Sequence, residues 1–107
     1  TLQREYPFSL LADANRFYPD ALPGEEILLQ GVIDGWFETE EGLTLFDFKT
    51  DRVPPYAAQD RAQRYQGQLA AYAYALETLT QKPVVHCLLW FLHPGVGIDL
   101  AGENEKN

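Results

Sequence analysis

Hydrophobic and polar positions along the first forty residues predict two β-strands. Residues 5–11 form a short apolar segment, and Pro7 places it at a sheet edge because proline cannot donate a hydrogen bond to a neighbouring strand. Residues 26–38 are rich in aliphatic and aromatic side chains and predict a long strand. Gly31 and Gly35 within it indicate a bulge or a point where another part of the chain approaches the backbone closely.

A hairpin is the next predicted feature. Residues 39–42 (TEEG) form a turn, so that residues 43–49 return as an antiparallel strand. Side chains alternate between the two faces of a strand, which puts Asp47 and Lys49 on the same face. Counted outward from the turn, antiparallel pairing would bring Asp34 close to Asp47.

The second half of the chain has a helical period followed by one more strand. Residues 59–80 carry apolar side chains at alternating four- and three-residue steps and predict a helix, which Pro83 ends. Residues 84–92 predict a buried strand, and residues 99–107 a polar, flexible tail. The helical stripe consists of Tyr65, Leu69, Tyr72, Leu76 and Leu79. This order predicts one mixed α/β domain over residues 1–98, in which the helix packs on the sheet.

Composition limits what such a domain can be. With 107 residues, 46% hydrophobic and 22% charged, the chain is long and apolar enough to fold as one domain. Its apolar segments are shorter than the ~18 residues that a membrane span needs. The single cysteine, Cys87, excludes an internal disulfide and a multi-cysteine metal or iron–sulfur site. The net charge of −8 argues against a free-standing nucleic-acid binder, because such proteins normally present a basic surface.

Two aspartates and a lysine are the strongest candidates for chemistry. Asp34 and Asp47 would repel each other unless a cation lay between them, and their hard oxygen atoms suit Mg²⁺ or Mn²⁺. Lys49 beside them can position a water molecule or stabilise charge that develops on a phosphoryl oxygen. An ordinary ion pair between Asp47 and Lys49 would satisfy the same two side chains. The spacing by itself leaves both interpretations open.

The predicted helix supplies further polar side chains. Gln68 and Tyr72 are four residues apart and therefore project from the same face. Arg61, Arg64 and Gln68 also follow helical spacing and could donate hydrogen bonds to successive phosphates of a nucleic acid. Tyr72 belongs to the apolar stripe as well, so that core packing and contact with a phosphate are both open to it.

Four segments, in this order and at these intervals, resemble a known family. They are residues 4–8 (REYPF), 30–34 (QGVID), 45–51 (LFDFKTD) and 68–72 (QLAAY). The sequence is similar to the RecB-type nuclease domains of the PD-(D/E)XK superfamily, and more closely to the C-terminal nuclease domain of AddA-type subunits of bacterial helicase–nucleases. The resemblance extends over residues 4–92. It implies a restriction-endonuclease-like α/β fold, a mixed β-sheet with a flanking helix and a truncated core, as in a fragment of a larger helicase–nuclease.

The resemblance also assigns roles to residues of the hairpin. Asp34 and Asp47 would bind a divalent metal ion, together with the backbone carbonyl of Phe48. Lys49 would orient and activate the attacking water.

Further roles that the resemblance implies lie outside the hairpin. Gln68 and Tyr72 match a Gln-x-x-x-Tyr motif that orders the site and holds the DNA backbone, and Glu5 matches a Glu-x-Pro-Phe segment that would support the site. RecB-type domains usually carry a further metal-binding histidine on a helix upstream of these motifs. The two histidines here, His86 and His93, lie downstream, and His86 is expected in the core.

A metal-dependent DNA exonuclease is the function that the resemblance implies. Such a domain hydrolyses phosphodiester bonds with Mg²⁺, which Mn²⁺ can replace, inside a helicase–nuclease complex for double-strand break repair and recombination. A helicase motor would feed it a single-stranded DNA end, and a partner subunit of AddB type would accompany it in the bacterial cytoplasm. Part of the charge of −8 would then hold cations, and basic surfaces elsewhere in the complex would bind the DNA.

Two other interpretations remain open. A nuclease-like fold without catalytic activity would channel single-stranded DNA or dock a partner subunit, although the intact set of Asp34, Asp47 and Lys49 argues against it. A stand-alone member of the superfamily, such as a small repair or CRISPR-adaptation exonuclease, is disfavoured because this sequence lacks the clustered cysteines of the iron–sulfur members.

Overall fold

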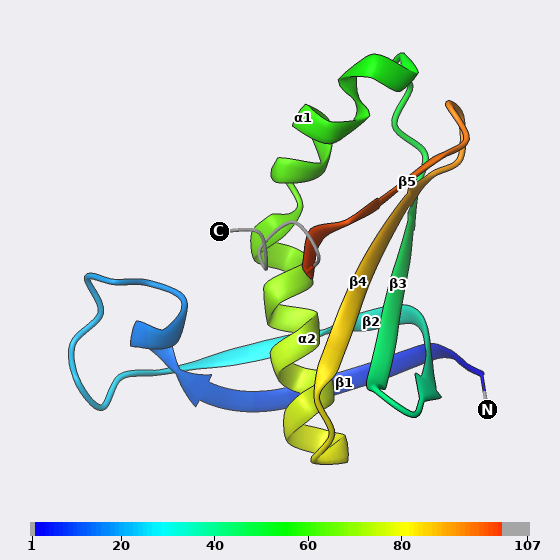
Figure 1. Ribbon diagram of the computed structural model, residues 1–107. Coiled ribbons are helices and arrows are strands. Elements are labelled where there is room, and N and C mark those ends of the chain that lie inside the picture. The colour runs from blue at the N-terminus through cyan, green and yellow to red at the C-terminus, as the bar shows by residue number, and fades with distance from the viewer. Residues whose placement is uncertain (1, 102–107) are drawn as a thin grey trace.

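A five-stranded mixed sheet with strand order β1-β2-β3-β4-β5 forms the centre of the molecule, and α2 lies across one of its faces (Figure 1). This is a computed structural model, and it describes residues 2–101. The elements are β1 (Gln3–Asp13), η1 (Ala14–Arg16), β2 (Glu26–Thr39), β3 (Gly42–Lys49), η2 (Pro55–Ala57), α1 (Ala58–Gln63), α2 (Gln66–Thr80), β4 (Val84–Phe91) and β5 (Val96–Asp99). The architecture agrees with the expected restriction-endonuclease-like α/β fold.

The first three strands form an antiparallel meander; the hairpin of β2 and β3 confirms the prediction, and the pairing of β1 with β2 adds to it. β1 is an edge strand that contains Pro7, and it is longer than the predicted segment. The turn between β2 and β3 gives the pairs Thr39↔Gly42 and Gly35↔Phe46. At Gly35 the ring of Phe46 lies so close that an added Cβ would come within 2.0 Å of it, which confirms the predicted close approach.

β3 and β4 run parallel, and the crossover between them contains both α-helices. Parallel strands need such a crossover, and it brings the carboxyl ends of both strands to the same edge of the sheet. The pairs Asp47↔Leu89 and Lys49↔Phe91 lie at that edge. The sequence does not predict β5, which pairs with β4, because a strand of four residues is too short to show a period.

The predicted single helix over residues 59–80 is wrong, because the structure divides it between α1 and α2 at Arg64 and Tyr65. The N–H groups of these two residues donate to the carbonyls of Arg61 and Ala62, three residues back, which tightens the chain into a 3₁₀-like turn. α2 ends where expected, with Gln81 in the left-handed region (φ 60°). Leu79 of the expected stripe is exposed rather than buried.

The core lies between α2 and the sheet. Its largest fully buried side chains are Phe91, Ile33, Leu43, Leu45, Leu69, Leu76 and Leu89. Cys87 is buried as expected, and burial first, then the charges of Asp99 and Glu77, raises the pKa of its thiol to about 12. Among residues 2–101, no helix is long and apolar enough to cross a membrane.

His86 is placed differently from the expectation. Its side chain is 46% exposed, and Nδ1 lies 2.7 Å from Oδ2 of Asp99. The expected core position is wrong because His86 points to the sheet face that α2 does not cover, next to Cys87, which points the other way. Asp99 ends β5 and Leu100 is buried, so the predicted tail does not begin at residue 99. Residues 102–107 of the predicted tail lie outside the described residues.

Candidate active site

Asp34 and Asp47 face each other across the β2–β3 hairpin. The ladder ends with the pair Gly35↔Phe46, so the next residues outward are these two aspartates. Oδ2 of Asp34 accepts a hydrogen bond of 2.8 Å from the N–H of Phe48, which fixes its carboxylate against β3. The expected apposition of the two carboxylates is confirmed.

Asp47 is a buried carboxylate with an incomplete set of partners. It is 4% exposed, and Oδ2 lies 2.8 Å from Nζ of Lys49 but accepts no well-oriented hydrogen bond. Burial raises the pKa of Asp47, and the neighbouring Asp34 raises it further, although Lys49 acts in the opposite direction. A buried anionic oxygen with unsatisfied lone pairs is costly, so this position favours an additional cation.

The oxygen atoms present fit a hard divalent cation with an open coordination sphere. Within the part of the chain that the structure describes, no three His, Cys, Asp or Glu side chains are grouped to hold a metal. Two carboxylates fit Mg²⁺, which keeps several water molecules and is bound by one or two carboxylates plus phosphate oxygens. The carbonyl of Phe48 stays a predicted third ligand.

Lys49 is held from three directions at the end of β3. Its Nζ lies 2.8 Å from Oδ2 of Asp47, donates a 2.8 Å hydrogen bond to Oε1 of Gln68, and lies 4.3 Å from the centre of the Tyr65 ring. Its side chain is 17% exposed, so the ammonium group is largely enclosed. The ion pair that the sequence left as an alternative does form, within a larger set of contacts.

Gln68 and Tyr72 join the same site from α2. Nε2 of Gln68 donates to the Tyr72 hydroxyl at 3.3 Å, so the motif forms one connected pair. The Tyr72 ring packs edge-on against Phe8 and closes on Gly31, where an added Cβ would lie 3.2 Å from it. Burial raises the pKa of Tyr72, as do the charges of both aspartates. The ring therefore belongs to the core while the hydroxyl belongs to the site.

The other predicted residues lie around this centre. Nη1 of Arg61 binds Oδ2 of Asp51 at 2.8 Å, and Arg64 is exposed. Glu5 is exposed and sits between the pairs Arg4↔Gly35 and Tyr6↔Ile33, hence across from Asp34. Its φ of 49° is strained for a residue other than glycine, and such strain is concentrated at functional sites.

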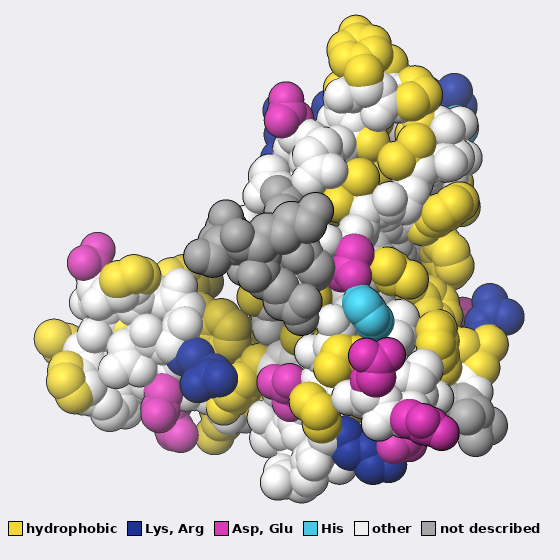
Figure 2. Space-filling model, in the orientation of Figure 1, with side chains coloured by type: hydrophobic (Ala, Val, Ile, Leu, Met, Phe, Trp, Pro, Cys, Tyr) yellow, Lys and Arg dark blue, Asp and Glu magenta, His cyan; other side chains and the backbone are white. Residues whose placement is uncertain are grey.

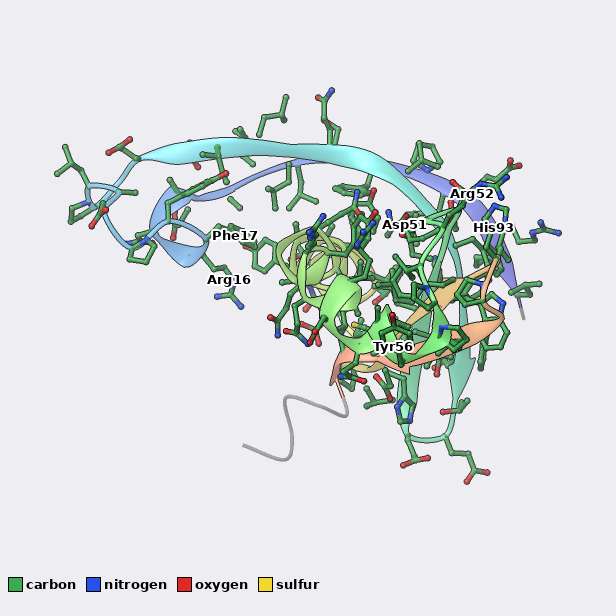
Figure 3. The ribbon with its side chains drawn as sticks, turned by 90° about the horizontal axis from the view of Figure 1, so that it is seen from above. Arg16, Phe17, Asp51, Arg52, Tyr56 and His93 are labelled. Atoms are coloured by element: carbon green, nitrogen blue, oxygen red, sulfur yellow. The ribbon has the colours of Figure 1, made fainter. Side chains whose placement is uncertain are left out.

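Sequence reasoning assigned no role to Asp51. It follows β3 at the edge where β4 also ends, and Figure 3 shows it there with Arg52 and His93. Its carboxylate binds Arg61 and the hydroxyl of Tyr65. The available signal was its place at the end of the segment 45–51, two residues after Lys49.

Comparison with known proteins agrees with this geometry. The model of the PD-(D/E)XK nuclease superfamily matches residues 1–106. The chain belongs to the PD-(D/E)XK nuclease superfamily. This confirms the resemblance expected from the four segments, and it makes the chain a nuclease domain of a superfamily whose members generally use divalent metal ions.

Similar curated proteins are named as subunits of an ATP-dependent helicase/nuclease. The protein of Lacticaseibacillus casei is 47% identical over 103 residues, which cover 94% of this chain and 8% of the relative. Those of Enterococcus faecalis and Moorella thermoacetica are 38% and 42% identical, over 97% and 89% of this chain and 9% and 7% of their own lengths. This PD-(D/E)XK chain thus spans less than a tenth of the length of these relatives.

Proposed function

We propose that this domain hydrolyses phosphodiester bonds of DNA with a divalent cation, and that it acts as an exonuclease. The observation that carries the proposal is the buried Asp47 carboxylate, which faces Asp34 and lies 2.8 Å from the ammonium group of Lys49. The proposed cation is Mg²⁺, which Mn²⁺ can replace.

Each residue of the site has a proposed part in this reaction. A divalent cation supplies polarisation of the phosphate and a lowered pKa of bound water. Asp34, Asp47 and the carbonyl of Phe48 would hold it. Lys49 orients the water and stabilises negative charge on the phosphoryl oxygens, because its ammonium group is already fixed beside the Asp47 carboxylate.

The remaining polar residues are proposed to hold the substrate. Gln68 and Tyr72 would bind the backbone next to the scissile bond, since Gln68 touches both Lys49 and Tyr72. Arg64 and those N–H groups of Arg61 that do not bind Asp51 would contact further phosphates. Glu5 would support the site from β1.

A larger enzyme is the proposed setting. Since the relatives are helicase/nuclease subunits, we infer that a helicase motor delivers a single-stranded DNA end to this site. A second subunit of AddB type would complete a complex for double-strand break repair and recombination in the bacterial cytoplasm. The net negative charge of this chain supports this setting, because basic surfaces elsewhere in the complex would then bind the DNA.

A nuclease assay on single- and double-stranded DNA, with the complete protein that carries this sequence, tests the proposal. Asp34→Asn, Asp47→Asn and Lys49→Ala should each lower the Mg²⁺-dependent cleavage rate by at least about 100-fold, the effect of removing one preorganised charge from a reacting centre. Asp60→Asn, on an exposed position of α1, is the matched control and should cut normally. Cleavage by Asp47→Asn at the wild-type rate would contradict the proposal.

A nuclease-like module without catalytic activity is the second candidate. The Asp47–Lys49 ion pair favours it, because the pair partly neutralises the site without a metal. Calorimetric titration with Mn²⁺ separates the two. Heat of binding to the wild-type chain that disappears in Asp47→Asn supports the metal site, whereas no heat in either protein supports the module without activity.

A further inference from the structure

A second polar cluster lies directly behind the ammonium group of Lys49. Oδ1 and Oδ2 of Asp51 lie 2.9 and 2.8 Å from the hydroxyl of Tyr65, which donates to them. Nη1 of Arg61 lies 2.8 Å from the same Oδ2. The Asp51 side chain is 13% exposed, so this contact set is largely shielded from water.

The face of the Tyr65 ring is the side of this cluster that meets Lys49. Nζ lies 4.3 Å from the ring centre, within the range of a cation–π contact. The negative face of the ring attracts the positive charge of the ammonium group and does not need one of its N–H groups to point at a particular acceptor atom. Asp47 and Gln68 bind Nζ from other directions, so the ring closes the third side of the enclosure.

Tyr65 itself is fixed at both ends. Its backbone forms the tight turn between α1 and α2, and its N–H donates to the carbonyl of Ala62. Its ring lies 6.4 Å from that of Phe91 in the core, and its hydroxyl is bound by Asp51. A ring held at its backbone, its edge and its hydroxyl has little freedom to move away from Lys49.

We propose that Tyr65 is a positioning residue for Lys49, and that Asp51, itself held by Arg61, anchors Tyr65. This inference rests on the proposed nuclease function, in which Lys49 orients the attacking water. A lysine side chain has a long flexible stem, and misplacement of a catalytic group by about 1 Å costs on the order of 100-fold in rate. The break in the helix is explained by the same arrangement, since it turns the Tyr65 ring onto the end of β3.

Three variants of the complete protein separate the ring from its hydroxyl. Tyr65→Leu removes the ring, and Tyr65→Phe keeps the ring but loses the bond to Asp51. Tyr56→Leu makes the same change as the first variant at a tyrosine of η2 that is 89% exposed, and serves as the matched control. We expect kcat to fall 10- to 100-fold in Tyr65→Leu and two- to fivefold in Tyr65→Phe, with KM for DNA within twofold, as for residues that orient a catalytic group. Tyr56→Leu should keep the wild-type values.

The separate effects on kcat and KM distinguish a positioning role of Tyr65 from direct contact with DNA. If KM rises while kcat is unchanged, Tyr65 contacts the DNA and the proposal is overturned. Wild-type kcat in Tyr65→Leu overturns it as well. If Tyr65→Leu does not fold, the test rests on Tyr65→Phe. An unchanged kcat in that variant would show that the bond from the Tyr65 hydroxyl to Asp51 does not contribute to positioning, and would overturn the proposal.

A spectroscopic readout tests the positioning without any cleavage. The chain has three lysines, Lys49, Lys82 and Lys106, so the side-chain Hε resonances of Lys49 can be assigned by substitution. A proton over an aromatic face is shifted upfield, and we expect this shift at Lys49, a smaller one in Tyr65→Phe, and none in Tyr65→Leu. An upfield shift with an inactive wild-type enzyme would refute the nuclease function and leave the contact standing. The absence of the shift in the wild-type chain would refute the positioning role alone.

Discussion

Two aspartates four residues apart, Asp47 and Asp51, differ in electrostatic state because their partners differ. Burial and Asp34 raise the pKa of Asp47. Burial acts on Asp51 in the same direction, but the hydrogen bonds from Arg61 and Tyr65 and the charge of Arg61 outweigh it, and its pKa lies below the usual value. Both oxygens of Asp51 therefore accept hydrogen bonds from the protein, whereas the buried Oδ2 of Asp47 has the Lys49 ammonium group as its charged neighbour.

The lowered pKa of Asp51 leads to a pH-dependent stability. A carboxyl group whose pKa is lower in the folded state stabilises the fold above its ordinary value of 3.8, and this contribution is lost as the pH falls through the lower native value. Asp51→Asn should therefore reduce the free energy of unfolding by about 1 kcal/mol at pH 7, and by less at pH 3. Urea denaturation of both proteins at the two pH values measures the difference. A gap that widens in acid would contradict the assignment.

At the scale of elements, the hairpin was predictable and the division of the helix was not. The turn at residues 39–42 and the apolar segments around it fix the register, so the meeting of Asp34 and Asp47 follows from counting. The apolar period runs unbroken through Tyr65, and the local pattern therefore contains no sign of the turn there. The Tyr65 hydroxyl is bound by Asp51, which is distant in sequence, and contacts of this kind can override a local period.

Gly35 tests how the hairpin holds its register. In Gly35→Ala the new Cβ would overlap the Phe46 ring at 2.0 Å, and the ring must move. We expect a loss of about 1–2 kcal/mol in the free energy of unfolding, as for an overpacked site. Gly67→Ala is the matched control, because outside the local backbone of α2 nothing lies within 4 Å of its Cβ position, and it should be neutral or stabilising by up to about 1 kcal/mol. Thermal and urea unfolding compare the two, and equal effects would contradict the argument.

At the scale of the whole molecule, acidic side chains outnumber basic ones, with 16 Asp and Glu against 8 Lys and Arg. Figure 2 shows acidic side chains scattered over one face, among hydrophobic and neutral surface, with Lys and Arg in fewer places. Glu40 and Glu41 lie in the turn at the start of β3, whereas Asp47 and Lys49 lie near its end. The acidic turn is therefore separated from the site by the length of the strand. The net charge can be predicted from composition alone, but the separation of the acidic turn from the site can be seen only in the folded structure.

The acidic balance predicts weak DNA binding by this chain alone. Because few basic groups are available to displace counterions, we expect a dissociation constant above roughly 10⁻⁵ M for single-stranded DNA at physiological salt. Ca²⁺ should tighten binding by neutralising the two aspartates, and Asp47→Asn should lose that gain. Fluorescence anisotropy with labelled DNA measures both. Submicromolar affinity without a divalent cation would show that the chain carries a basic path of its own.

The mixed topology of the sheet has a consequence for the order of assembly. The hairpin needs only a short loop, so Asp34 and Asp47 can meet before the rest of the sheet has formed. Gln68 reaches Lys49 across 19 residues, and the parallel pairing of β3 with β4 closes a still longer loop. We therefore expect the acidic pair to form before the lysine is fixed. With the proposed function, a nascent chain would bind cations at the two aspartates before Lys49 is in place for cleavage of DNA.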